Sequence, residues 1–253
     1  MKFFCSLILI IGQAYAQVDF KYAASARSYP TGGSMNAEAG YSQMLWGTAG
    51  GDNLMYGLIR PSINYDTSGV VSATDSKITF FPISFIGFGA GHKSYKSTYE
   101  DFEYYNCEDE VRCTGDMEKD YNFGKVALAL SNILTSYTYT EYRNGYEQVD
   151  DNNYGVAEYE TVTIANPLNE EVIQRSTFLG YKMGEDLIGL VSDQHHFQRS
   201  EKNSQMTLGI YKIRYSMFDI LTGIGSFHSS DYDPGAVAIL RINHTLLPSM
   251  ALF

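Results

Sequence analysis

Long apolar stretches are missing from this sequence. Beyond residue 16, no segment approaches the eighteen or so consecutive apolar side chains that a membrane-crossing helix needs, so no transmembrane helix is predicted. Basic residues are also few. The chain carries 18 lysines and arginines against 29 aspartates and glutamates. Its net charge of −11 argues against nucleic acid as a partner.

The N-terminus has the three parts of a secretory signal peptide. Lys2 supplies a positive start, Ser6–Gly12 is a short apolar run, and Ala14-Tyr15-Ala16 matches the small-x-small pattern that signal peptidase cleaves. The apolar run is too short to span a bilayer as a helix. We therefore expect residues 1–16 to be removed on export, leaving a single domain over residues 17–253.

Cysteine is scarce as well. Of the three cysteines, Cys5 lies in the predicted signal peptide, which leaves Cys107 and Cys113 in an acidic stretch. An exported protein meets an oxidising compartment, so a local disulfide between these two is predicted. A metal-binding pair is the alternative, but no histidine lies nearby. We expect neither a metal site nor a cofactor.

Segments with alternating apolar and polar residues are abundant. In residues 17–27, Val18, Phe20 and Tyr22 fall on one face, and Asp19 and Lys21 fall on the other. Most of these segments are longer than the five or six residues of an ordinary soluble strand and suit the nine to eleven that cross a membrane at a tilt. The twelve predicted strands cover residues 17–27, 37–47, 53–65, 70–83, 85–97, 121–131, 133–148, 172–183, 187–199, 205–216, 218–229 and 236–247.

The predicted connections alternate in length. Tight ones fall near residues 48–52, 82–84, 132, 184–186 and 216–217, and longer polar ones cover residues 28–36, 66–69, 98–120, 149–171, 200–204 and 230–235. Short turns at one rim and longer loops at the other are typical of an up-and-down membrane barrel, with the turns in the periplasm and the loops outside. Residues 156–164 could form a further strand, and we interpret them as a hairpin that extends the fourth outer loop.

The whole mature chain resembles the β-barrel proteins of the Gram-negative outer membrane. The resemblance rests on the signal peptide, the twelve alternating segments and the C-terminal Phe253. It implies a porin-like antiparallel barrel in the bacterial outer membrane, surrounded by lipid and lipopolysaccharide. It also implies that the outer-membrane assembly machinery reads Phe253.

The polar face of each strand would then line the interior. The predicted lumen-lining residues are Asp19, Lys21, Arg27, Asp75, Lys77, Lys93, Arg241 and Asn243. Asp19 and Arg241 are expected to meet where the first and last strands close the barrel. In residues 205–216, Met206, Leu208 and Ile210 share a face with Lys212 and Arg214, which requires either a bulge or bases that snorkel outward.

Two functions remain open at this point. A lumen lined by both signs of charge favours a small porin-like channel for small polar solutes. Alternatively, internal ion pairs plug the barrel, and its acidic, disulfide-bearing outer loops bind a partner, a cation or a glycan. Those loops, residues 98–120 and 149–171, hold nine and six of the 29 acidic residues. A solvated, repulsive surface is the better explanation of such charge.

Two motifs resemble known functional sites, but each departs from the pattern that the site requires. The segment Gly87–Ser94 resembles a phosphate-binding loop, but His92 stands where glycine is needed, and we predict a glycine stripe facing the interior instead. His228 and Ser230 reproduce the His-x-Ser spacing of outer-membrane phospholipase A, a minor alternative function. The continuation of that motif is absent, because Asp231 follows Ser230, so we do not expect an enzyme.

Overall fold

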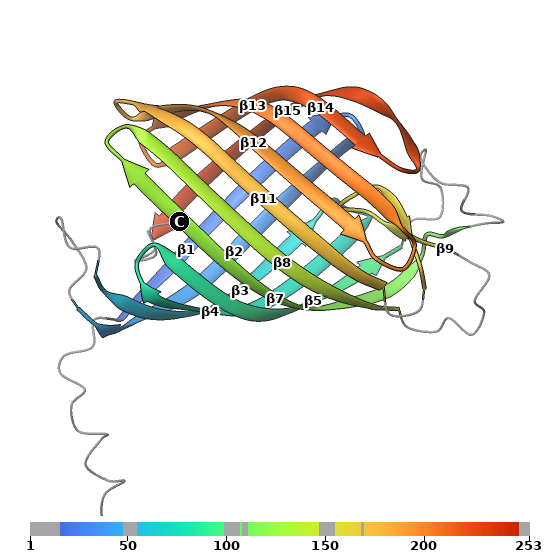
Figure 1. The fold of residues 1–253 in the computed structure, drawn as a ribbon, viewed down its shortest axis with the longest axis horizontal. Helices are drawn as coiled ribbons and strands as arrows, with labels where there is room; N and C mark the ends of the chain where they lie inside the picture. The colour runs from blue at the N-terminus through green and yellow to red at the C-terminus, as the bar shows by residue number, and fades with distance from the viewer. Residues whose placement is uncertain are drawn as a thin grey trace, which may run out of the picture.

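The protein is a closed antiparallel β-barrel of twelve strands. The computed structural model describes residues 16–47, 55–98, 107, 111–146, 155–167 and 170–247. The chain closes when β1 pairs with β15, so that the strands run round the wall in the order β1-β15-β14-β13-β12-β11-β8-β7-β5-β4-β3-β2. The predicted fold class is confirmed. Figure 1 shows the strands running diagonally across the wall.

All twelve predicted strands are present. They are β1 (Ala16–Ser28), β2 (Thr31–Trp46), β3 (Gly57–Thr67), β4 (Val71–Ile83), β5 (Ile86–Ser97), β7 (Gly115–Leu130), β8 (Ile133–Tyr146), β11 (Glu170–Met183), β12 (Asp186–Phe197), β13 (Lys202–Tyr215), β14 (Phe218–Ser229) and β15 (Tyr232–Leu247). Three shorter strands, β6 (Val111–Arg112), β9 (Gly155–Glu158) and β10 (Thr163–Ala165), form a separate small sheet.

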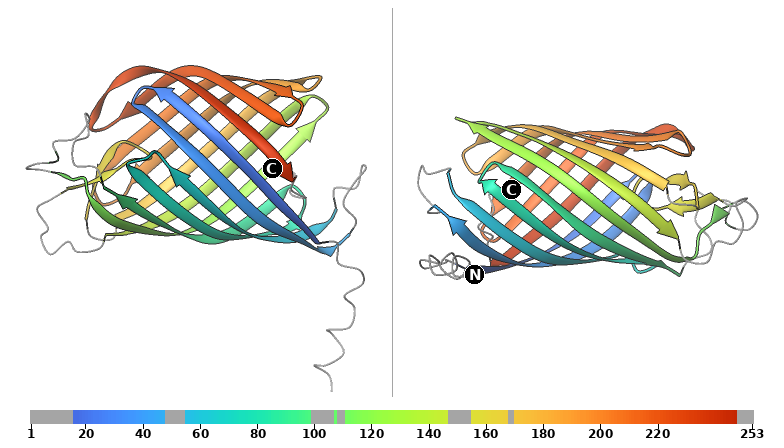
Figure 2. Two further views of the ribbon diagram at one scale, coloured as in Figure 1. Left: turned by 180° about the vertical axis from the view of Figure 1, so that it is seen from behind. Right: turned by 60° about the horizontal axis from the view of Figure 1, so that its bottom comes forward.

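The two rims of the barrel differ. We call the rim where β1 begins and β15 ends the turn end, and the opposite rim, where β9 and β10 lie, the loop end (Figure 2). The predicted signal peptide apart from Ala16, the tight turn at residues 48–52 and Phe253 lie outside the described residues, as do residues 99–106, 108–110, 149–154 and 168–169 of the two acidic loops.

Several strands begin earlier than predicted, so some outer connections are shorter than expected. β2 begins at Thr31 instead of residue 37, and β7 begins at Gly115 instead of residue 121. Likewise, β13 and β15 begin at Lys202 and Tyr232. These extensions are glycine- and serine-rich or highly polar. They pair through their backbones without showing the apolar alternation that sequence analysis detects.

The alternation of faces explains why a sheet of this sequence closes. In β1, Asp19 and Ala23 are buried inside, whereas Val18 and Tyr22 are exposed outside. The same outward pattern recurs around the wall and leaves an exposed apolar belt that includes Ile63, Ile78, Phe88, Leu179, Leu190, Ile224 and Leu240. Among the described residues, no helix is long and apolar enough to cross a membrane.

Strand β13 corrects one sequence interpretation. It pairs with β12 and β14 in unbroken register, so no bulge is present. Leu208 and Ile210 are buried with Phe227 and Val237, and Met206 packs against this cluster. One sector of the interior is therefore apolar, and neither a bulge nor outward-snorkelling bases are needed.

The glycine stripe of β5 faces inward, as the sequence indicates. A Cβ built on Gly91 would lie 2.3 Å from the Tyr121 ring, and one on Gly89 would lie 2.7 Å from the Phe123 ring. These aromatic rings of β7 therefore lie directly over the β5 backbone, an approach that only glycine permits.

Candidate functional site

The lumen at the loop end is crossed by a hairpin made of β9, β10 and the turn between them, residues 155–165, which we call the lumen hairpin. Its backbone is bonded to one side of the barrel. Ser204 of β13 donates from Oγ to the Thr161 carbonyl at 2.9 Å, and Ser229 of β14 donates to the Val162 carbonyl at 2.9 Å. The predicted hairpin is present, and it folds into the barrel mouth.

An apolar contact strengthens this attachment. Val162 is only 4% exposed and packs in the same cluster as Leu208, Ile210, Phe227 and Val237. Its backbone φ of 51° is in the left-handed region, which disfavours a β-branched residue. Burial of the Val162 side chain therefore holds this residue in a backbone conformation that valine disfavours.

Ion pairs attach the same hairpin to the far side of the barrel. Lys119 of β7 bonds to Glu158 and also reaches Glu160 at 3.2 Å, and Lys93 of β5 bonds to Glu160. Both lysine ammonium groups lie over the Tyr95 ring, at 4.6 and 4.7 Å from its centre. The hairpin thus spans from the β13–β14 wall to the β5–β7 wall.

Electrostatics favour the ionised form of the hairpin turn. Burial alone would raise the pKa of the Glu160 carboxyl, but the positive charges of Lys93 and Lys119 outweigh it and hold that pKa well below its ordinary value. The Glu160 side chain nevertheless remains 41% exposed. It therefore faces open space within the mouth as well as its lysine partners.

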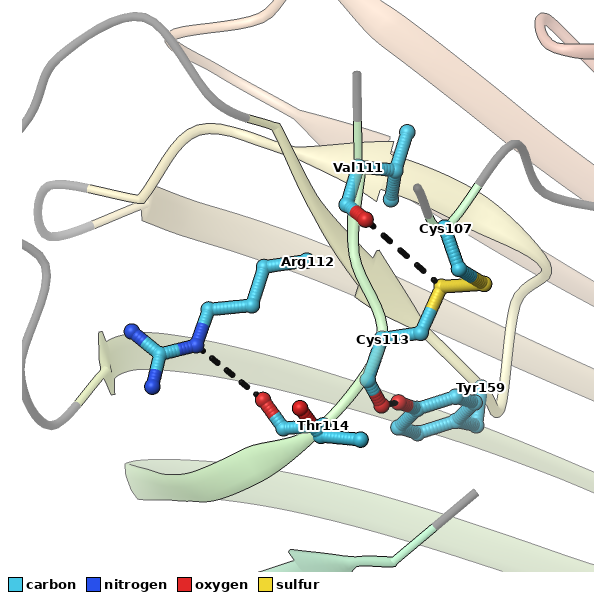
Figure 3. The surroundings of a disulfide bond; sticks show 6 residues. All are labelled: Cys107, Val111, Arg112, Cys113, Thr114 and Tyr159. Carbon is cyan, nitrogen blue, oxygen red and sulfur yellow. Dashed lines mark hydrogen bonds between the residues drawn. A yellow bond between two sulfur atoms is a disulfide. The ribbon is translucent and has the colours of Figure 1, made fainter. Parts of the chain in front are cut away.

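A disulfide supports the lumen hairpin from the loop end. Cys107 and Cys113 are bonded with their Cα atoms 5.5 Å apart. Cys113 directly follows β6, which pairs in parallel with β9. Tyr159, in the hairpin turn, donates its hydroxyl to the Cys113 carbonyl, as Figure 3 shows. Burial raises the pKa of this phenol to about 12, so it stays a donor at neutral pH.

A second charged cluster lies on the inner wall towards the turn end. Arg60 of β3 donates to Asp19 of β1 from Nε at 3.0 Å and Nη2 at 2.5 Å, and to Glu38 of β2 at 2.8 Å. Lys21 completes the cluster with a 2.9 Å contact to Glu38. A Cβ on Gly40 would lie 2.5 Å from the guanidinium, so this glycine makes room for Arg60.

The structure places the remaining predicted lumen residues on the inner face. Asp75 accepts a hydrogen bond from the Tyr121 hydroxyl at 2.6 Å. Arg241 donates to the Asn243 side-chain oxygen at 2.8 Å. Lys77 lies between Asp75 and Thr79 on the inward face of β4, and Arg27 approaches Gly32.

The expected meeting of Asp19 with Arg241 is wrong. Asp19 binds Arg60 across β2, because β1 pairs with β2 on that side and the long arginine side chain reaches over Gly40. The strand that carries Arg241 closes the barrel on the other side of β1, where Arg241 lies opposite Ser25.

Sequence reasoning missed the residues that carry most of the interior charge contacts, namely Glu38, Arg60, Lys119, Glu158 and Glu160. The first three could have been found by extending the two-residue alternation through β2, β3 and the early part of β7. No alternation of this kind marks Glu158 and Glu160. They lie in a predicted loop, and a loop sequence does not indicate whether the loop folds into the barrel.

His228 and Ser230 of the His-x-Ser motif lie at the end of β14, next to β13. Ser230 is bonded to backbone atoms of Asn203, accepting from its amide at 2.8 Å and donating to its carbonyl at 3.2 Å. A register shift separates Phe227 from Ser229 in the β14–β15 pairing, and no hydrogen bond joins His228 to Ser230 in the described part of the chain. No group of three potential metal ligands occurs among the described residues.

Comparison with known proteins identifies no family. No family model matches this chain, and no curated protein matches it. Among solved structures, it is similar to the β domain of the Bordetella autotransporter BrkA (8% identity, 90% of this chain and 98% of that one, TM-score 0.40) and to the translocator domain of NalP from Neisseria meningitidis (8%, 94% and 91%, 0.33). It is also similar to a BenF-like porin from Pseudomonas fluorescens (6%, 93% and 99%, 0.26). Sequence identities and TM-scores this low support no conclusion about function.

Proposed function

We propose that this chain is an outer-membrane channel for small polar solutes whose outer mouth is narrowed by the lumen hairpin. The observation that carries the proposal is accessible charge inside a closed barrel. Lys21 and Glu160 keep 48% and 41% of their side chains exposed although both face the interior, and Arg241 is exposed there too. Charged groups with that much free surface require water around them.

The exposed apolar belt supports a membrane location. Large apolar side chains point outward from strands all round the barrel, as in Val18, Ile78, Leu190 and Ile224. In water such a continuous belt would drive aggregation, whereas in a bilayer it meets lipid. A closed barrel also leaves no unpaired strand edge, which a bilayer requires. We accordingly propose the bacterial outer membrane as the location of the chain, with lipid and lipopolysaccharide as the neighbours of the apolar belt.

A liposome-swelling assay with sugars of increasing size tests the proposal. Proteoliposomes carrying the wild-type chain should swell with small sugars and not with large ones. A variant in which residues 156–164 are replaced by a short glycine-serine linker should admit larger sugars. Ser230→Ala serves as the matched control, and it should neither change swelling nor alter lipid integrity, because transport and not hydrolysis is the proposed activity.

One observation favours a second candidate, a non-conducting barrel that acts through its outer loops. The lumen hairpin is fixed to both walls by hydrogen bonds, ion pairs and an apolar cluster, which is how a plug would be held. The same assay separates the two functions. Swelling by the linker variant but not by the wild-type chain would identify the hairpin as a plug.

A further inference from the structure

The inner wall of the barrel is apolar on one side. Strands β11 to β15 are neighbours in the wall, and they turn apolar side chains inward that pack into one cluster. We call this surface the apolar sector, and its members are Phe178, Val191, Leu208, Ile210, Leu221 and Ile239. Strand β4 stands six places from β13 in the order of the twelve strands, so its inward residues Asp75 and Lys77 face the sector across the lumen. The lumen therefore has an apolar side and a polar side.

An apolar side chain already occupies the loop-end part of the sector. Val162 of the lumen hairpin packs in one cluster with Leu208 and Ile210, and all three are buried. Further along the strands towards the turn end, Leu221 and Ile239 belong to the same cluster but remain partly exposed. Covering apolar surface that is in contact with water is favourable. The partly exposed members therefore offer another apolar group the kind of contact that Val162 makes.

The sector is also flat. A Cβ built on Gly180 would lie 2.4 Å from the Phe178 ring, and one built on Gly189 would lie 2.8 Å from it. A Cβ built on Gly223 would lie 3.0 Å from the Ile239 side chain. The large side chains thus lie against the wall over glycines instead of projecting across the lumen. A solute can contact them without the sector itself closing the passage.

We propose that the apolar sector binds the hydrocarbon or aromatic part of amphipathic solutes, and that the channel passes small polar molecules that carry such a part. This inference rests on the proposed channel function and names the class of solute. The interior of a water-filled barrel is ordinarily polar, so an apolar surface across five strands calls for an apolar occupant. The polar part of the solute would stay hydrated on the side of Asp75 and Lys77, while the apolar part covers Leu221 and Ile239.

Block of single-channel potassium chloride currents by n-alkyltrimethylammonium ions, from butyl to octyl, tests the proposal. All these ions carry the same charged head, so the change in block per added methylene reports apolar contact alone. In the wild-type chain the half-blocking concentration should fall about twofold for each methylene, as expected when about half of the methylene surface is buried. The triple variant Val191→Thr, Leu221→Thr, Ile239→Thr should lower this factor to about 1.4, because roughly half of the apolar contact is lost.

The matched control makes the corresponding change on the outer face of the same strands. Leu190→Thr, Ile224→Thr and Leu240→Thr alter exposed side chains of β12, β14 and β15 and should keep the twofold factor. A lower factor in this control would place the contact in the surrounding lipid and overturn the proposal. Ile239→Leu keeps the sector apolar at equal volume and should also keep the factor. Ile239→Thr alone should give an intermediate factor, and it carries the test if the triple variant does not insert.

The outcomes separate the two proposals. A conducting wild-type chain whose block does not depend on alkyl length, or depends on it equally in the sector variants, overturns the apolar binding site and leaves the channel standing. A wild-type chain that inserts but never conducts overturns the channel itself, and the proposed class of solute with it.

Discussion

Arg60 holds together the charged cluster on the inner wall towards the turn end. Its side chain is 9% exposed and serves two carboxylates, Asp19 and Glu38, that are themselves nearly buried. Buried charges are tolerated only when paired and hydrogen-bonded, so the three residues form one unit. Gly40 belongs to that unit because any larger side chain would displace the guanidinium.

Arg60→Ala should therefore destabilise the barrel strongly. The buried Asp19 carboxylate would lose its guanidinium partner and Glu38 would keep only Lys21 of its two close bases, at a cost of about 3–5 kcal/mol by analogy with other buried pairs. Removing all three charges together, as Asp19→Asn, Glu38→Gln and Arg60→Met, should cost less because no uncompensated buried charge remains; Lys21, which loses Glu38, is 48% exposed. Urea titration followed by heat-modifiable gel migration measures both. Equal midpoints for Arg60→Ala and the wild-type chain would refute the role given to this cluster.

Glu160 should confer an acid sensitivity on the hairpin. Its pKa is depressed in the folded protein, so the stabilising contact is complete above the ordinary glutamate value of about 4.3 and is lost as pH falls through the lower folded pKa. The titratable groups that face it include Lys93, Lys119, Tyr95, Tyr121, Tyr142 and Glu158.

Current recordings at stepwise lower pH measure this effect. We expect steady currents at pH 5 and above, and larger, noisier currents only well below pH 4.3. Glu160→Gln should be noisy at neutral pH already and should change less on acidification. Onset of noise near neutral pH in the wild-type chain would disagree with the lowered pKa.

At the scale of elements, the lumen hairpin is attached at three places of different chemistry. Ion pairs hold it to β5 and β7, hydrogen bonds and Val162 hold it to β13 and β14, and β6 pairs with β9 beside the disulfide. The disulfide closes a short loop, so it restrains that loop and adds little to the stability of the barrel.

Reduction should consequently loosen the hairpin and spare the barrel. Adding a phosphine reductant to a reconstituted channel should increase current fluctuations, because β6 loses the constraint that places it against β9. Heat-modifiable migration should stay unchanged. Cys107→Ser, Cys113→Ser should be noisy from the outset and insensitive to the reductant. A wild-type current that reduction leaves unaltered would exclude this coupling.

The strands could be predicted from the sequence and the hairpin's position could not. Each barrel strand can be recognised from the alternation of its side chains, as in Val18, Asp19 and Phe20, because one face points outward and the other lines the interior. The early residues of β2, such as Gly32 and Gly33, escape this rule, because they extend the wall through backbone pairing alone.

The interior contacts depend on residues far apart in the chain. Lys119 and Glu158 are 39 positions apart, and Ser229 and Val162 are 67 apart. No local pattern encodes such pairings. The apolar interior of β13 was missed for a related reason, since an interior position was assumed to be polar, whereas Leu208 and Ile210 are covered there by Val162 of the hairpin.

At the scale of the whole molecule, the barrel separates three environments. The outer surface is apolar, the inner wall towards the turn end carries the Arg60 cluster, and the mouth is crossed by a hairpin whose glutamates pair with lysines of β5 and β7. A solute entering from the loop end would pass the hairpin first and the Arg60 cluster afterwards.

Single-channel recording of the purified wild-type chain in a planar bilayer tests the central claim most directly, which is that water and ions pass the hairpin. We predict discrete, stable conductance steps at neutral pH that increase when residues 156–164 are replaced by a short linker. Inserted, heat-modifiable wild-type protein that gives no steps, while the linker variant conducts, would contradict the claim.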